Sequence, residues 1–285
     1  MNKLTEENLR AVIHPRPQQS HKGSFGRAVL IGGNETYGGA IIMSAEAVVK
    51  SGAGLVSVVT PEKNQVALHV RLPEAMVLDW DKQEQLLDLL ETANVILIGP
   101  GLGLDDAANN LLSTVLAHQK QQQWLVIDGS AITLFADKNH SLKFPETVVF
   151  TPHQMEWQRL SGINIPDQNE IANTAVQKKL GATIVLKSHR TEIYSAKTSY
   201  RNSLGTPAMA TGGMGDTLAG IITGFLAQFP EKEAAICAAV YLHSLIGEDL
   251  GAERFVVLPT EISQHLAFYM KKFEQLYKKT SESPS

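Results

Sequence analysis

Short runs of β-branched residues alternate with helical patterns along most of this 285-residue chain. This order constrains the fold strongly, because apolar strands separated by crossover helices form a parallel sheet that is covered on both faces. The strands are predicted at Ala28–Ile31, Val56–Thr60, Val95–Gly99, Leu125–Asp128, Val148–Thr151 and Thr183–Lys187. The sequence therefore predicts an α/β fold of three layers, αβα, with a mainly parallel central sheet.

Helical patterns fill the intervals between these strands and continue after the last one. They lie at Ala40–Lys50, Lys82–Glu91, Ala107–His118, Glu170–Leu180, Asp216–Gln228, Glu231–Glu248 and from about Thr260 onward. The segment Glu192–Leu204 has no helical pattern, so we expect an antiparallel hairpin at one edge of the sheet. No linker, repeat or low-complexity stretch divides the chain, which predicts one domain over residues 1–279. The polar composition of residues 280–285 predicts a disordered tail.

Charge and composition exclude several classes of protein. The net charge of −4 and the lack of a long basic run argue against binding to nucleic acid or to anionic membrane. The N-terminus lacks the apolar core of a signal peptide, and the apolar stretch Leu218–Phe229 is too short to cross a bilayer. The single cysteine, Cys237, excludes an internal disulfide and a cysteine-rich zinc site. We therefore expect a cytoplasmic protein that works on small molecules.

Ligands of a parallel sheet bind beyond the carboxyl ends of its strands. The residues at these points are small, polar or ionisable: Gly32–Asn34, Gly99–Gly103, Asp128–Ser130, Thr151–His153 and Lys187–His189. Each is weak evidence alone, because turns favour Gly, Asp and Ser for backbone reasons. His153 could be a hydrogen-bonded structural residue or part of a site. Lys187 could contact a phosphate or extend into solvent.

The most informative motif is Thr211-Gly212-Gly213-Met214-Gly215-Asp216, which precedes an amphipathic helix. Free N–H groups at a helix N-terminus bind anions, and the glycines let a phosphate approach the backbone. Asp216 has two interpretations. It could be a helix N-cap or a first-turn acid, or it could be a general base that takes a hydroxyl proton beside a transferred phosphoryl group. The three adjoining glycines favour the general base.

Familiar phosphate-binding, hydrolase and zinc motifs are absent from the sequence. It has no Gly-x-x-x-x-Gly-Lys-Ser/Thr loop, no Gly-x-Ser-x-Gly elbow and no His-Glu-x-x-His pair. Gly101-Leu102-Gly103 lacks the third glycine of a dinucleotide fingerprint.

Several motifs together resemble one family, and they occur in colinear order from Lys22 to Gly247. The resemblance rests on Lys22-Gly-Ser-Phe-Gly26, Gly39-Ala40, Ser51-Gly-Ala-Gly-Leu55, Gly99-Pro-Gly-Leu-Gly103, Thr151-Pro-His153, Val185-Leu-Lys187, Thr211–Gly220 and Ala239-Val-Tyr-Leu-His243. These look like the ADP/ATP-dependent NAD(P)H-hydrate dehydratases, a family with a ribokinase-like fold. The resemblance implies a metabolite-repair enzyme that phosphorylates the ring hydroxyl of hydrated NADH or NADPH. Phosphate then leaves, and the dihydronicotinamide is regenerated.

The resemblance also assigns roles to particular residues. Asp216 matches the position of the base and borders the hydrate. The residues that match hydrate-contacting positions are Ala40, Gly103 and His153. The residues that match nucleotide-contacting positions are Lys187, Ser188, His189, Arg190, Thr191 and Gly215. Gly212 and Gly213 join them because they belong to the predicted phosphate site at the helix N-terminus. Ser130, Met214 and Ser188 depart from the family pattern.

ADP is the expected co-substrate, with ATP as the alternative, and Mg²⁺ is the expected metal. Only about twenty residues precede the first motif, so we expect a stand-alone dehydratase without an epimerase domain, acting on one epimer and forming a homo-oligomer. One competing interpretation is a small-molecule kinase of the same superfamily, acting on a vitamin or a sugar alcohol. A non-catalytic nucleotide sensor is disfavoured, because pure binding would gain from losing the charge of Asp216.

Overall fold

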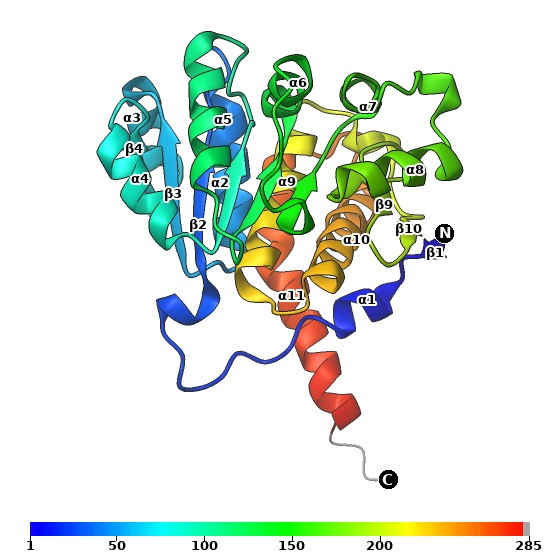
Figure 1. The fold of residues 1–285 in the computed structure, drawn as a ribbon. Helices are drawn as coiled ribbons and strands as arrows, with labels where there is room; N and C mark the ends of the chain where they lie inside the picture. Colours follow the sequence, from blue (N-terminus) through cyan, green and yellow to red (C-terminus); the bar gives the residue numbers. More distant parts are fainter. Residues whose placement is uncertain (282–285) are drawn as a thin grey trace.

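A ten-stranded sheet forms the centre of the protein in the computed structural model, which describes residues 1–281 (Figure 1). The strand order is β1-β10-β9-β8-β7-β6-β5-β2-β3-β4, and β9 alone among these strands runs against the others. The strands are β1 (Asn2–Lys3), β2 (Arg27–Ile31), β3 (Leu55–Thr60), β4 (Met76–Asp79), β5 (Val95–Ile98), β6 (Trp124–Ile127), β7 (Val148–Phe150), β8 (Thr183–Leu186), β9 (Glu192–Tyr194) and β10 (Ser199–Arg201).

Helices cover both faces of this sheet. The α-helices are α1 (Glu6–Arg10), α2 (Gly38–Lys50), α3 (Glu62–Arg71), α4 (Gln83–Thr92), α5 (Asp106–His118), α6 (Gly129–Asp137), α7 (Gln154–Ser161), α8 (Glu170–Leu180), α9 (Met214–Gln228), α10 (Lys232–Gly251) and α11 (Pro259–Ser281). Short 3₁₀ helices are η1 (Lys22–Phe25), η2 (Pro145–Thr147), η3 (Ile165–Asp167) and η4 (Pro207–Met209). Side chains of α2, α9, α10 and α11 share one core cluster, and those of α4 to α8 share the other.

Alternation along each strand divides the core into these two clusters. In β2, Ala28 and Leu30 belong to the cluster of α9, whereas Val29 and Ile31 belong to the cluster of α5. Successive strand side chains point to opposite faces, so a strand buried on both sides is apolar throughout. This confirms the three-layer αβα fold predicted from the sequence.

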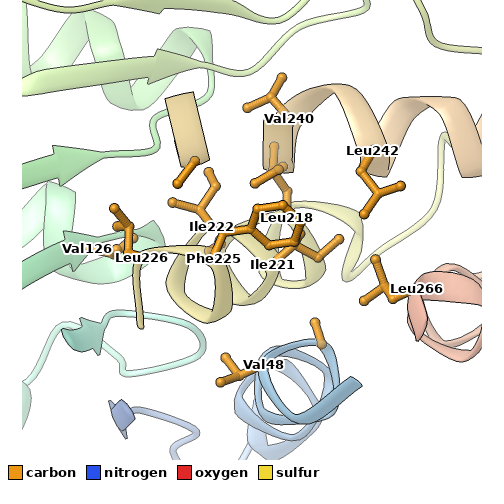
Figure 2. Close-up of a cluster of buried hydrophobic side chains, with 14 of the residues drawn as sticks. Val48, Val126, Leu218, Ile221, Ile222, Phe225, Leu226, Val240, Leu242 and Leu266 are labelled. Atoms are coloured by element: carbon orange, nitrogen blue, oxygen red, sulfur yellow. The ribbon is translucent and has the colours of Figure 1, made fainter. Parts of the chain in front are cut away.

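Helix α9 lies at the centre of the first cluster (Figure 2). Its apolar side chains pack between Val48 of α2, Val126 of β6, Val240 and Leu242 of α10, and Leu266 of α11. These α9 residues are Leu218, Ile221, Ile222, Phe225 and Leu226, all at most 4% exposed. The glycine motif is therefore attached to one of the most deeply buried helices of the protein.

The six strands predicted from β-branched runs are all present, with ends that differ by a residue at most. The predicted hairpin is the antiparallel pair β9–β10, but it does not form the edge of the sheet, because β1 pairs in parallel with β10. The ammonium group of Met1 also pairs with Glu170, at 2.9 Å. Helix α11 extends to Ser281, and the rest of the predicted disordered tail, residues 282–285, lies outside the described part.

Strands β1 and β4 and the helices α1, α3, α6 and α7 were not predicted from the sequence. Helix α3 buries only Leu68, so it shows no apolar stripe for a periodicity argument to detect. None of the helices in the described chain is long and apolar enough to cross a membrane.

Candidate active site

Three neighbouring strands end in side chains that bond to one another. Asp128 follows β6, Thr151 follows β7 and Lys187 follows β8. Lys187 Nζ donates to Asp128 Oδ1 at 2.7 Å, and Thr151 Oγ1 donates to the same oxygen at 2.6 Å. Asp128 is 1% exposed, so this is an ion pair at the floor of the strand ends rather than on the surface. Lys187 therefore does not extend into solvent.

The ammonium of Lys187 also reaches the glycine motif. A Cβ atom placed on Gly215 would lie 3.1 Å from Lys187 Nζ, which is tight for a real side chain. Burial alone would lower the pKa of the Lys187 ammonium, but the carboxylates of Asp128 and Glu156 outweigh it and raise that pKa above its ordinary value. A permanent cation thus stands beside the N-terminus of α9.

Within the glycine motif, Gly213 is the residue that directly precedes α9. It is the N-cap, with a left-handed φ of 92°, which glycine adopts without strain. The helix consequently begins at Met214 and not at Asp216, so the N-cap interpretation of Asp216 is wrong and Asp216 lies in the first turn. No side chain in the described chain caps α9, and a Cβ on Gly212 would meet nothing within 4 Å. The free backbone N–H groups at the start of α9 therefore lie beside an open space.

The pKa of the Asp216 carboxyl group lies closer to neutral pH than is usual for an aspartate. Burial and the neighbouring Asp128 carboxylate raise the pKa of Asp216 to about 6, against the opposing effect of Lys187. Glu156 adds a smaller effect in the same direction as Asp128. Such a carboxylate is ionised at pH 7 but takes up a proton readily, as a general base requires.

His153 caps the helix that follows β7. Its Nδ1 accepts from the backbone N–H groups of Met155 and Glu156, and Glu156 Oε2 accepts from the N–H of His153 at 2.8 Å. These bonds give His153 a structural role, and its ring stays half-exposed beside the strand ends. Burial raises the pKa of Glu156, which lies 3.3 Å from His153 Nε2.

Two of the predicted hydrate-contacting residues, Ala40 and Gly103, lie on the β2 and β5 side of the same edge. Ser44 Oγ lies 3.1 Å from the carbonyl oxygen of Ala40 and 2.9 Å from that of Asp216, so the first turns of α2 and α9 are held together. A Cβ on Gly101 would lie 3.0 Å from Ala40 Cβ, which places the Gly99–Gly103 loop against Ala40. Gly103 lies beside the amide of Asn34.

The segment from Lys187 to Thr191 forms a turn beside the approach to the glycine motif. Ser188 and His189 are exposed, and Ser188 Oγ accepts from the N–H of Arg190 at 3.1 Å. Arg190 donates to the carbonyl of Gly205 at 3.3 Å, and Thr191 donates back to the carbonyl of Ser188. Of these five residues, Lys187 is the one that the structure places against Gly215.

Two acidic residues of this cluster, Asp128 and Glu156, were not predicted as site residues. Asp128 was recognised as a strand-end residue only, and its pairing with Lys187 joins positions 59 residues apart. Glu156 stands three residues after His153, the spacing of a capping box. That spacing was the available signal for Glu156, and it indicates a helix start rather than a site.

A cavity of about 930 Å³ lies elsewhere, at the C-terminal end of α9. Its lining includes Arg16, Gly52 and Gln228 and none of the predicted site residues. Arg16 is engaged there, since it donates to the carbonyl of Gly52 and to Gln228 Oε1. The cluster at the strand ends is the better candidate because it combines charge, open backbone donors and a carboxylate with a raised pKa.

Comparison with known proteins first defines the class. A solved ribokinase-like superfamily protein from Enterococcus faecalis is 59% identical to this chain and superposes with a TM-score of 0.95, covering 96% of this chain and 97% of the other. The protein is thus a ribokinase-like α/β protein. The family model described as NAD(P)H-hydrate dehydratase matches residues 28–267, and the chain belongs to that family.

Two further relatives are informative. A curated ADP-dependent (S)-NAD(P)H-hydrate dehydratase from E. faecalis is 59% identical over 275 residues, covering 96% of this chain and 94% of the relative. A solved ADP/ATP-dependent NAD(P)H-hydrate dehydratase from Bacillus subtilis, co-crystallised with ATP and Mg²⁺, is 30% identical with a TM-score of 0.84, covering 96% and 99% of the two chains. The family and fold expected from the motifs are confirmed.

Proposed function

We propose that this protein is an ADP-dependent (S)-NAD(P)H-hydrate dehydratase that repairs hydrated NADH and NADPH. The nucleotide phosphorylates the hydroxyl of the hydrated ring, phosphate is then eliminated, and NAD(P)H, AMP and phosphate are the products. The observation that carries the proposal is the match to a dehydratase of this name over nearly the whole of both chains. Phosphorylation makes chemical sense, because hydroxide is a poor leaving group and phosphate is a good one.

In the first step Asp216 takes the proton of the ring hydroxyl. The hydroxyl oxygen bonds to the terminal phosphorus of the nucleotide as the bond from that phosphorus to the bridging oxygen breaks. The pKa of about 6 suits this role, because the carboxylate is free at neutral pH and still basic. Ala40, Gly103 and His153 lie around this edge of the sheet and would border the hydrate.

The nucleotide phosphates would lie against the first turn of α9. The N–H groups after Gly213 supply donors, and Lys187 supplies a fixed positive charge beside Gly215. Asp128 holds Lys187 in this position and so acts through it. Arg190 and the rest of the Lys187–Thr191 turn would lie along the same nucleotide, with Gly212 open to it.

The residues present also fit a Mg²⁺ ion. Hard oxygen donors suit this cation, and it is commonly held by one or two carboxylates together with phosphate oxygens. Glu156 and Asp128 are the carboxylates near Lys187 other than the base. No group of three His, Cys, Asp or Glu side chains in the described chain could hold a metal alone, so nucleotide phosphates would complete the shell. The ion would neutralise charge on the transferred phosphoryl group.

A small-molecule kinase would use the same base and glycine motif, and it differs in keeping the phosphorylated product. The experiment that separates the two supplies purified protein with NADPH hydrate, Mg²⁺ and either ADP or ATP, and follows the absorbance of regenerated dihydronicotinamide. The proposal expects regeneration, faster with ADP, and from the S epimer. Phosphorylation of a vitamin or sugar alcohol without regeneration would support the kinase instead. A cytoplasmic location and a homo-oligomeric state remain part of the proposal.

A further inference from the structure

One side chain in the turn after β2, Asn34, carries two amide N–H donors that no group accepts within residues 1–281. Its Oδ1 accepts from the backbone N–H groups of Thr36 and Tyr37, at 3.0 and 2.9 Å. Because both neighbours are donors, the atom that faces them is the oxygen, and Nδ2 lies on the other side of the amide. There Nδ2 is 2.8 Å from the position that a Cβ atom on Gly103 would occupy. The free donors of Asn34 are thus held beside Gly103.

The backbone that carries Asn34 is fixed on two sides. Its own N–H donates to the carbonyl of Gly101 at 2.6 Å. The preceding carbonyl, that of Gly33, accepts from Thr60 Oγ1 at 3.0 Å and from Asn64 Nδ2 at 2.5 Å. A side chain on such a backbone loses little freedom when it binds a partner, so the entropic cost of using its donors is low.

A structural role in the turn accounts for only one half of this amide. The turn uses Oδ1 alone, and the oxygen of an aspartate or a serine would accept N–H groups in the same way. The donors of Nδ2 take no part in the turn. A few polar groups held in fixed positions are what orient a ligand in a binding site. The amide of Asn34 is therefore suited to a ligand that brings an acceptor to Gly103.

The turn of Asn34 is joined to the base through a short series of contacts. The N–H of Ala40 donates to the carbonyl of Tyr37 at 3.1 Å, so the turn leads directly into the first turn of α2. Ser44 Oγ joins that turn to the carbonyl of Asp216. The free amide and the base therefore belong to one edge of the protein and are linked through Ala40.

The hydrated ring offers an acceptor on the side opposite to its hydroxyl. Water adds to the ring double bond that is not conjugated with the carboxamide, and the hydroxyl goes to its carbon next to the ring nitrogen. That carbon lies across the ring from the carbon that carries the carboxamide. When the hydroxyl faces Asp216, the carboxamide therefore points away from the base.

We propose that Asn34 is a substrate-binding residue, which donates from Nδ2 to the carboxamide oxygen of the hydrate. The bond orients the ring so that its hydroxyl faces Asp216. This inference rests on the proposed function, because that function places the hydrate against Ala40 and Gly103. It adds a contact that selects for the carboxamide end of the substrate.

The test removes the donor and keeps the turn. Asn34→Asp and Asn34→Ser both retain an oxygen for the N–H groups of the turn, but aspartate has no amide donor and the serine hydroxyl is too short to reach Gly103. Asn169→Asp is the matched control. Asn169 Oδ1 accepts from two backbone N–H groups in the same way, at the start of α8.

We expect kcat/KM for the hydrate to fall roughly 3–10-fold in Asn34→Ser, the range of one hydrogen bond. It should fall further in Asn34→Asp, because a carboxylate would face the carboxamide oxygen with no proton between them. The ADP affinity, measured by calorimetry, and the melting temperature should stay close to those of the wild type in both variants. Asn169→Asp should change neither kcat/KM nor the ADP affinity.

Binding without turnover locates the contact on the substrate. With AMP saturating the nucleotide site, NADH is titrated in one series and ADP-ribose, which lacks the nicotinamide, in another. Asn34→Ser should weaken the binding of NADH and leave that of ADP-ribose unchanged. Equal weakening of both would place the donor on a ribose or phosphate oxygen and would contradict the inference.

Two further outcomes would overturn the assignment of Asn34. A wild-type kcat/KM in Asn34→Asp would show that only the turn needs this residue, and so would a failure of both Asn34 variants to fold. If one variant fails to fold, the other decides by the same comparisons. If the wild-type protein binds ADP but does not regenerate NADPH from the hydrate, the proposed function has failed, and this inference falls with it.

Discussion

Lys187 and Asp128 form an ion pair across strand β7, with 2.7 Å between Nζ and Oδ1. Both side chains are largely withdrawn from water, at 17% and 2% exposed. A pair of this kind is worth less for stability than its geometry suggests, because both charges lose their hydration. Its value here lies in placement, since it holds a cation beside Gly215 at the start of α9.

Removing the Lys187 cation alone should lower the free energy of unfolding more than removing both charges of the pair. Lys187→Met leaves Asp128 charged, buried and without its partner, so we expect a loss of about 3–5 kcal/mol in unfolding free energy. The double variant Asp128→Asn/Lys187→Met should recover much of this loss, while ADP binding stays weak in both. Chemical denaturation and titration with ADP check the two quantities separately. A double variant that is no more stable than Lys187→Met would show that the buried charge is not the cause.

Asp216→Asn tests the base. Turnover should fall by roughly 10²–10⁴-fold, the usual contribution of a positioned proton acceptor. ADP binding should survive or tighten slightly, because a negative charge beside the phosphates is gone. The measurements are steady-state turnover and calorimetric titration with ADP. Near-normal turnover in this variant would show that Asp216 is only a first-turn acid of α9 and not the base.

The same substitution has an effect on stability whose sign follows from the pKa. Since folding raises the pKa of Asp216 from 3.8 to about 6, its contribution to stability is fully present below pH 3.8 and is lost as the pH rises through 6. Asp216→Asn should therefore melt higher than wild type at pH 8, and the difference should shrink towards pH 4. Melting curves of both proteins between pH 4 and pH 8 measure this difference in melting temperature. A variant that melts lower at pH 8 would mean that the carboxylate is held by favourable contacts instead.

The pH dependence of turnover should report the environment of Asp216. Activity should decline below about pH 6 as the base takes up a proton. Asp128→Asn removes a carboxylate that raises this pKa and also frees Lys187 to stabilise the ionised base, so the acid limb should move to lower pH. Rate profiles at saturating substrates measure the shift. A limb that moves to higher pH, or that does not move, would contradict the electrostatic coupling.

Gly215→Val should affect the nucleotide before the chemistry. A Cβ at this position comes within 3.1 Å of Lys187 Nζ, and the larger side chain would fill the phosphate path. We expect ADP affinity to fall at least about tenfold, in contrast to Asp216→Asn. Gly162→Ala is a control for stability alone, because the left-handed φ of 75° at that helix C-cap penalises a side chain although the space beside it is open. It should lower the melting temperature and leave ADP affinity unchanged. Equal ADP affinity in Gly215→Val and wild type would place the phosphates elsewhere.

Much of the fold could be predicted because the strands are buried on both faces and therefore appear as continuous apolar runs. The order of those strands could not, since β1 pairs with a strand far along the chain and its two residues carry no pattern. The start of α9 was also misplaced. An amphipathic pattern shows where a helix buries its side chains, whereas the first turn depends on the left-handed backbone of Gly213.

The candidate site, too, was predicted only in part. Asp216, Lys187 and the glycines were predicted because each occurs in a local motif or directly after a strand. Asp128 and Glu156 act through neighbours on other strands and helices, and a single sequence does not show which side chains meet in space. Their effect on Asp216 is visible only once β6, β7 and β8 lie side by side.

The parallel pairing of β1 with β10 also constrains how the chain is assembled. Asn2 lies opposite Tyr200, so β1 has no partner until the chain has been synthesised beyond Tyr200. The interior strands can pair in the meantime, whereas the border of the sheet stays open. Closure of that border is consequently a late event in biosynthesis, and until then the backbone groups of β1 stay unpaired.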